Sequence, residues 1–291
     1  MVFKRLLGGK GSGGSGIPLE VDTGIPDVPL RPGGLLRGEI VLRAPDRDVT
    51  VRSVDMKLVA NASPAVGKRN AVDTESGDTI AHFRVTSHFT VGKGQETRVP
   101  LRYRLHWESP VSEVRGKPLE GVRLRAYTFV EAGGIEGRTD SDPLRIAATP
   151  LHEAVLDAFE AAGYSHGTAQ IDADTIPRTE RHVYLRQSFR LVDTLAVTGP
   201  DRPEHLEVNF HTNAVGCEIF VRKAALFQTI WSEKPPYLRY VAAHHEVGRF
   251  DFEAAVRGWI KEVAVLPEKR EDDRIERVEY DLGSPRIWID T

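Results

Sequence analysis

The chain has 291 residues, 40% hydrophobic and 28% charged, with a formal net charge of −3. This composition excludes a wholly disordered or collagen-like chain. The near-neutral charge argues against nucleic-acid binding over the whole surface. A single cysteine, Cys217, excludes an intramolecular disulfide, and no apolar run approaches the roughly 18 residues of a membrane span. We expect a cytoplasmic protein, and at about 100–200 residues per domain we expect two domains.

Residues 1–16 form a basic, glycine-rich N-terminal tail without an acidic side chain. Its first residues could place apolar side chains on one helical face, with basic side chains around them. Isolated helices shorter than about 12 residues are marginal, so three alternatives stay open: a flexible tail, docking onto a partner or the protein body, and weak peripheral membrane contact. The partner-binding candidates are Phe3, Lys4, Arg5, Leu6 and Leu7.

From residue 17 to residue 148, apolar and polar residues alternate with period two. Such alternation is typical of strands with one buried face. Turn residues separate the runs, and no helix-length segment lies between them, which favours an antiparallel β-sandwich over a parallel sheet with crossover helices. The predicted strands cover residues 36–42, 54–60, 81–91, 101–107 and 122–130.

The periodicity changes at residue 149. Thr149 and Pro150 form a helix start, with a capping hydroxyl followed by proline at the first helical position. An apolar stripe follows at helical spacing, and Gly163 is a suitable C-terminal glycine. We therefore predict a helix over 150–162, within an interdomain helix and linker over 149–167.

Residues 168–266 return to period two and predict a second β-sandwich. Asp251 is positioned to cap a helix near 251–264, whose apolar residues again form one stripe. Residues 267–291 form a charged C-terminal tail. The net charge is +1 over residues 17–149 and −7 over residues 150–291, a difference that hints at different partners for the two units.

The search for chemical motifs gives no catalytic site, no cofactor site and no strong metal site. The run at His244, His245 and Glu246 lacks the second histidine of a zinc helix. Asp140 and Asp142 form a D-x-D pair that could supply oxygen ligands to a cation, but the spacing lacks the other elements of a calcium loop. Aspartates also favour turns, so we expect a structural turn here, and the pair remains a weak cation candidate.

Three stretches, taken in order, resemble the bacterial sporulation-control protein family, which belongs to the arrestin-like group. The resemblance spans roughly residues 17–265. His106 and Trp107 depart from it, because the family usually has proline near the end of that strand, and the second domain matches loosely from Arg178 onward. The stretches are LRPGGLLRGEIVL at 30–42, VPLRYRL at 99–105 with SPVS at 109–112, and TDSDPLRI at 139–146, which leads into the helix from Pro150 to Gly163.

The resemblance implies two tandem immunoglobulin-like (arrestin-like) antiparallel β-sandwiches joined by a short helix. It also implies a non-enzymatic regulator of sporulation or development that acts through protein–protein interaction, by strand addition or by surface complementarity. Some family members are linked to cell division or cytoskeletal partners. Two other classes stay open: a small-ligand or cation-binding sandwich that uses Asp140, Asp142 and the interdomain cleft, and an enzyme with a site near His244 or His245.

Overall fold

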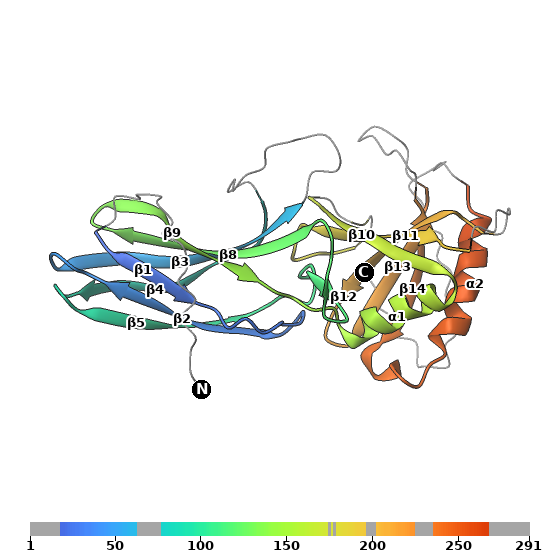
Figure 1. Ribbon diagram of the computed structural model, residues 1–291, viewed down its shortest axis with the longest axis horizontal. Coiled ribbons are helices and arrows are strands. Elements are labelled where there is room, and N and C mark those ends of the chain that lie inside the picture. The colour runs from blue at the N-terminus through green and yellow to red at the C-terminus, as the bar shows by residue number, and fades with distance from the viewer. Residues whose placement is uncertain are drawn as a thin grey trace.

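The computed structural model shows an elongated molecule with a strand-rich first half and a second half made of one sheet and two helices (Figure 1). The N-terminal candidates at positions 3–7 lie outside the described residues. No helix in the described part is long and apolar enough to cross a membrane. The structure describes residues 18–62, 77–173, 176, 179–195, 202–224 and 235–267.

The first half is an antiparallel β-sandwich, as predicted. One sheet has the order β1-β2-β5 and the other the order β4-β3-β8-β9, while β6 and β7 pair as a small hairpin. Leu36, Ile40 and Leu42 of one sheet and Val54 and Met56 of the other are fully buried. The bounds are β1 (Glu20–Gly24), β2 (Leu35–Arg43), β3 (Val49–Ala62), β4 (Asp78–Val91), β5 (Glu96–Arg104), β6 (Glu113–Val114), β7 (Lys117–Pro118), β8 (Val122–Ala132) and β9 (Ile135–Leu144).

Two local predictions in this half are wrong. The strand predicted over 101–107 ends at Arg104, so Trp107 lies in a turn, closed by the bond from Ser109 N–H to the carbonyl of His106. The Asp-rich run is not a turn but part of β9, paired with β8. A strand accommodates Asp140 because its carboxylate accepts the backbone N–H of Thr23 on β1 at 2.6 Å, which satisfies the side chain without a turn.

The second half contains one five-stranded antiparallel sheet in order β10-β11-β12-β13-β14. The helices α1 and α2 lie side by side against one face of it (Figure 1). The mainly β, antiparallel prediction is confirmed, but within the described residues the second layer here is helical rather than a second sheet. The bounds are α1 (Pro150–Ala161), β10 (Tyr164–Asp172), β11 (Arg186–Asp193), β12 (His205–Thr212), β13 (Gly216–Lys223), β14 (Leu238–Ala243), the 3-10 helix η1 (His244–Glu246) and α2 (Phe252–Ala264).

Helix capping explains where both helices begin. The Thr149 hydroxyl accepts the His152 N–H at 3.2 Å, and the Asp251 carboxylate accepts the Ala254 N–H at 2.9 Å, so each cap satisfies an otherwise unpaired donor. Gly163 ends α1 with φ of +87°, a conformation that favours glycine. The chain enters β10 directly afterwards, inside the segment predicted as linker.

The two faces of the second sheet differ in chemistry. On the helix-covered face Tyr240 stacks on Trp259 of α2, with ring centroids 4.3 Å apart. On the opposite face Glu207 and Arg222 are both 2% exposed, and the guanidinium donates to both carboxylate oxygens at 2.8 and 2.7 Å. Tyr237 donates to the same carboxylate at 2.8 Å. Burial disfavours the Glu207 carboxylate, yet Arg222 and Arg186 outweigh burial and lower its pKa.

Candidate functional site

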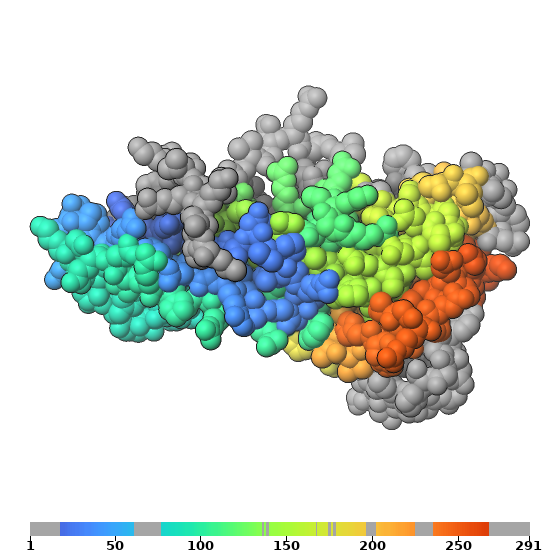
Figure 2. All heavy atoms as spheres, turned by 60° about the horizontal axis from the view of Figure 1, so that its bottom comes forward, coloured from blue at the N-terminus to red at the C-terminus, as the bar shows by residue number. Residues whose placement is uncertain are grey.

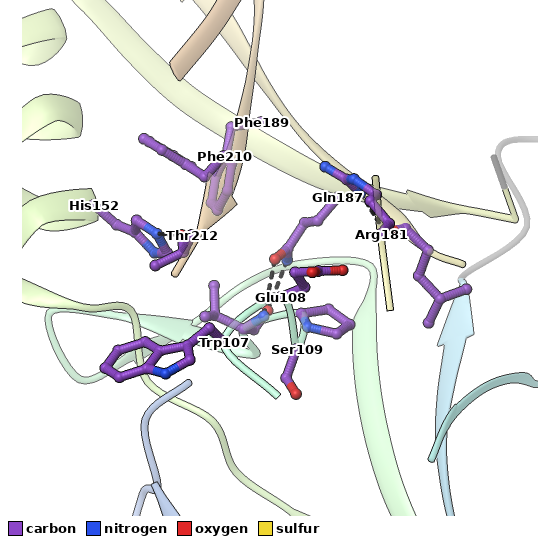
Figure 3. A pocket seen from close by; sticks show the side chains of 12 residues that line it. Trp107, Glu108, Ser109, His152, Arg181, Gln187, Phe189, Phe210 and Thr212 are labelled. Carbon is purple, nitrogen blue, oxygen red and sulfur yellow. Dashed lines mark hydrogen bonds between the residues drawn. The ribbon is translucent and has the colours of Figure 1, made fainter. Parts of the chain in front are cut away.

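The two halves meet at a junction that contains two hollows. The loop after β5 comes from the first half, and α1, η1 and the segment before β11 come from the second. Figure 3 shows Trp107 and Glu108 of the loop together with His152, Gln187 and Phe210 of the second half around the smaller hollow. Residues distant in sequence therefore build one site.

The larger hollow is a groove of about 430 Å³. Its walls are a turn of the first half, the indole of Trp107, the beginning of α1 and the imidazole of His244. The rings of Trp107 and His244 lie 5.5 Å apart between centroids, so the two halves touch at the groove wall. The residues that line it are Arg31, Pro32, Gly33, Gly34, Trp107, Thr149, Pro150, Leu151 and His244.

Gly33 fixes the position of the Trp107 indole. Its φ is +74°, and a Cβ atom added there would lie 2.4 Å from the indole ring, so the ring packs directly on the glycine backbone. Two backbone bonds hold the turn against the loop: Leu105 N–H to the carbonyl of Gly34 at 2.9 Å, and Gly33 N–H to the carbonyl of His106 at 3.4 Å. The glycine-rich turn therefore shapes the groove as well as starting β2.

Glu108 connects the loop of the first half to the second half. Its carboxylate accepts the backbone N–H groups of His182 and Val183 at 2.8 and 3.1 Å, and it lies 3.6 Å from Nε2 of His211. Burial alone would raise the pKa of Glu108, but the hydrogen bonds from His211, Val183 and His182 lower it to about 2. Glu108 is therefore a carboxylate at neutral pH.

His211 lies between two carboxylates. Its Nδ1 is 3.3 Å from Glu218, and Arg239 pairs with the other oxygen of Glu218. Burial works against a charged imidazole, but Glu108 and Glu218 raise the pKa of His211 to about 9. The pKa of Glu218 is about 2, because its bonds to His211 and Arg239 outweigh burial. A row of alternating charges thus crosses the junction in its ionised form at neutral pH.

Two further contacts hold the halves together: one between uncharged groups and one that includes an ion pair. The Gln187 amide accepts the Val111 N–H at 2.8 Å and donates to the Val111 carbonyl at 2.7 Å (Figure 3), as a neighbouring strand would. In the β6–β7 turn, the Arg115 N–H bonds to Glu153 of α1 at 2.8 Å, and its guanidinium pairs with Glu160 at 2.7 Å. The two halves are therefore held in one defined arrangement.

The smaller hollow is a cavity of about 20 Å³, which suits one water molecule rather than a metabolite. His152 on its wall is buried and bonds through Nε2 to the hydroxyl of Thr212 at 2.6 Å. Burial, with the nearby His244, lowers the pKa of His152 to about 3, so the ring is neutral at neutral pH. This geometry favours a structural role.

The cation candidates lie elsewhere. Asp140 and Asp142 are on β9 and line neither hollow, so they do not form one site with the interdomain cleft. Burial, together with Asp140 and Asp22, raises the pKa of Asp142 to about 7. Across the described part of the chain, no three His, Cys, Asp or Glu side chains are grouped to hold a metal.

His244 and His245, the candidates for an enzyme active site, also lack a catalytic arrangement within the described residues. Nε2 of His244 bonds to the carbonyl of Asn213 at 2.9 Å, and its ring faces Trp107 rather than a carboxylate. His245 is exposed on η1. Neither histidine is therefore paired with an acidic partner that could orient it as a base.

A family model described as SpoOM protein matches residues 3–223, about three quarters of the chain. The chain belongs to the Spo0M family. It is 27% identical over 192 residues to the sporulation-control protein spo0M of Bacillus subtilis (strain 168), covering 66% of this chain and 69% of that relative. The crystal structure of Spo0M from Bacillus subtilis matches with a TM-score of 0.68 at 21% identity, over 84% of this chain and 99% of that one. At this identity the structural likeness shows the fold, and the predicted family is confirmed.

The Spo0M match spans both halves and the junction between them. Sequence reasoning missed Trp107, Glu108 and His211 as a group, because they come from a loop and a strand far apart in the chain. One signal was present: His106 and Trp107 depart from the family's usual proline. A tryptophan at a turn, followed at once by an acid, marks the loop that meets the second half.

Proposed function

We propose that this Spo0M-family chain is a non-enzymatic, cytoplasmic regulator of sporulation or a related developmental decision, and that it acts by binding a protein partner at the junction groove. The family match supports the regulatory role. The observation that carries the location is the groove of about 430 Å³ built from both halves. A partner bound there contacts both halves at once and is sensitive to their arrangement.

The lining of the groove favours a protein side chain as the occupant. The accessible apolar part of the lining is the exposed Pro150 and the half-buried Trp107, which provides a large flat ring. Pro32, Gly33 and Leu151 also line the groove but are buried. Tryptophan is enriched among the residues that dominate protein–protein binding energy. Small-molecule sites also need several converging polar groups, and this lining offers few. The groove therefore fits an apolar anchor residue of a partner protein.

The N-terminal candidates enter the proposal as a second contact. The family match begins at residue 3 and therefore includes Phe3, Lys4, Arg5, Leu6 and Leu7. We assign them to partner contact, with weak membrane contact as the competing outcome. A chain that lacks residues 1–16 should capture less of the partner from cells, whereas loss of membrane recovery with unchanged partner capture would assign the tail to membrane.

Photo-crosslinking in sporulating cells tests the groove directly. Trp107→p-benzoylphenylalanine places a crosslinker in the groove wall, and Val265→p-benzoylphenylalanine is the matched control on an exposed site, 78% accessible. We expect a discrete protein adduct from position 107 only, and reduced sporulation with Trp107→Ala in a protein that still folds. No adduct at position 107, together with normal sporulation of the Trp107→Ala strain, would overturn the proposal.

A further inference from the structure

The outer face of the β1-β2-β5 sheet has two electrostatic zones. At the end remote from the second half, Arg43 pairs with Glu96 at 2.7 Å, and Arg98 pairs with Glu39 at 2.6 Å. At the end near the junction the exposed side chains are arginines. Figure 2 shows this side of the molecule, where the blue β2 segment and the turn before it adjoin the yellow-green residues of the second half.

Four exposed arginines form this second zone, which we call the arginine cluster. Arg102 and Arg104 are two residues apart on β5 and therefore share one face of the strand, and Arg104 donates to the carbonyl of Gly33 at 3.0 Å. Within the described part of the chain, none of the four forms an ion pair with a carboxylate, unlike Arg43 and Arg98 on the same sheet. The arginine cluster consists of Arg31, Arg37, Arg102 and Arg104.

The strand register makes the cluster unfavourable for the fold itself. Arg37 of β2 stands directly opposite Arg102 of β5, and like charges in such cross-strand positions are destabilising. Six residues along the same ladder, Arg43 stands opposite Glu96, which is the favourable combination. The sheet therefore tolerates a repulsive pair at one end only, where an external anion would relieve it.

We propose that the arginine cluster binds an acidic segment of the protein partner whose apolar anchor occupies the junction groove. This inference rests on the proposed function and names the chemistry of its partner. Arg31 belongs to the cluster and also lines the groove, so one continuous segment reaches both. Guanidinium groups bind carboxylates through paired hydrogen bonds, and the four arginines have no carboxylate partner among the described residues.

Charge and backbone chemistry favour side-chain recognition of a protein segment. The second half, which adjoins the cluster, carries −7, whereas the first half carries only +1, so an extended anionic surface such as a membrane or a nucleic acid is repelled on the side of the second half. Pro100 lies in β5, and a proline cannot donate a ladder hydrogen bond, which disfavours strand addition at this edge. A short acidic segment fits the small size of the cluster.

Fluorescence anisotropy with the full chain tests the cluster. The probe is a labelled peptide of about 12 residues that alternates Glu with Leu, and its control alternates Gln with Leu. We expect the Glu peptide to bind at least ~10-fold more tightly than the Gln peptide, with weaker binding as salt rises from about 50 to about 200 mM. Equal affinities for the two peptides would overturn the proposal.

Arg102→Glu is the decisive variant. It places a carboxylate opposite Arg37, so the fold should melt at or above the wild-type temperature, while the Glu peptide should bind at least ~10-fold more weakly. Arg123→Glu makes the same charge change on the exposed face of β8 and should change peptide affinity by less than about 2-fold. Loss of less than about 2-fold in Arg102→Glu would overturn the proposal.

Two further measurements separate the alternatives. Vesicles with about 30% phosphatidylserine, or single-stranded DNA of about 20 nucleotides, should bind more weakly than the Glu peptide. If either one binds more tightly than the peptide, and Arg102→Glu abolishes that binding, then a membrane or a nucleic acid, not an acidic protein segment, occupies the cluster. In cells, a crosslinked adduct at position 107 that persists in the Arg102→Glu variant would refute the proposal for the arginine cluster and leave the groove proposal standing. Peptide binding to the cluster without any position-107 adduct refutes the groove proposal alone.

Discussion

The Glu108 carboxylate, in a loop of the first half, lies 3.6 Å from Nε2 of His211 in the second sheet. Each group stabilises the charged form of the other: the pKa of Glu108 is lowered to about 2, and that of His211 is raised to about 9. The relative position of the halves, and with it the groove at Trp107, therefore depends on an ion pair that only the folded arrangement assembles.

Glu108→Gln should weaken the junction. Both backbone N–H groups donate to the same oxygen, Oε2, so an amide oxygen there can keep both bonds. His211, whose side chain is 18% exposed, loses a carboxylate partner, which should lower the free energy of unfolding by about 2 kcal/mol. Thermal melting and the NMR titration of His211 measure both effects, and the pKa of His211 should fall. Glu39→Gln removes an exposed pair with Arg98 and should lower stability much less, because solvent screens exposed ion pairs. Equal losses in the two variants would contradict a special role for Glu108.

The stability of the protein should fall on the alkaline side because of His211. Its folded pKa, about 9, lies above the ordinary value of 6.5, so the stabilisation is fully present below pH 6.5 and is lost as pH rises through 9. Between pH 6.5 and 9.5 we expect a loss on the order of 2 kcal/mol. Chemical denaturation across this range measures it. In His211→Gln this part of the slope should disappear; an unchanged slope would refute the assignment.

Much of the fold follows from the sequence, and the reasons are local. Period two records which strand faces are buried, so the sandwich strands are predictable, and a capping side chain followed by an apolar stripe places α1 and α2 within a residue of their observed starts at Pro150 and Phe252. Periodicity does not predict which loops contact each other in the folded protein. Glu108 contacts His182 and His211 only because the tertiary structure brings them together.

Polar side chains at buried positions account for the other differences. Glu207 and Arg222 are buried on the sheet face opposite the helices and satisfy each other, so a face that looks solvent-exposed in the sequence is buried in the fold. Asp140 is satisfied by the Thr23 N–H of a strand distant in sequence, so its preference for turns is overridden. In both cases a tertiary partner, not the local sequence, determines the outcome.

Asp142→Asn should stabilise the protein above neutral pH. Burial and the neighbouring Asp140 and Asp22 raise the pKa of Asp142 to about 7, so its favourable contribution is complete below the ordinary value of 3.8 and is lost as pH rises through 7. The gain in unfolding free energy should be small near pH 4 and about 1–2 kcal/mol near pH 8, after allowance for partial exposure.

Calcium provides the control for this prediction. If Asp140 and Asp142 instead held a cation, added Ca²⁺ would raise the melting temperature of the wild type at pH 8, and the double variant Asp140→Asn with Asp142→Asn would lose that rise. We expect no more effect from Ca²⁺ than from Mg²⁺ at the same ionic strength, because the described residues provide no group of three suitable ligands.

Gly33→Ala should distort the groove and destabilise the fold. The new Cβ would lie 2.4 Å from the Trp107 ring in a backbone with φ of +74°, so strain and overlap together should cost about 2–4 kcal/mol. Gly94→Ala is the matched control: its φ is +68° and nothing lies within 4 Å of the added atom, so only the backbone cost of about 1 kcal/mol applies.

A double-mutant cycle separates the two contributions. In a Trp107→Ala background the overlap is removed, so Gly33→Ala should cost no more than Gly94→Ala does, about 1 kcal/mol. The measurement is urea denaturation of the four proteins of the cycle. If Gly33→Ala costs the same with and without the indole, the glycine serves only the turn, and the packing of Trp107 on its backbone does not hold the groove wall in place.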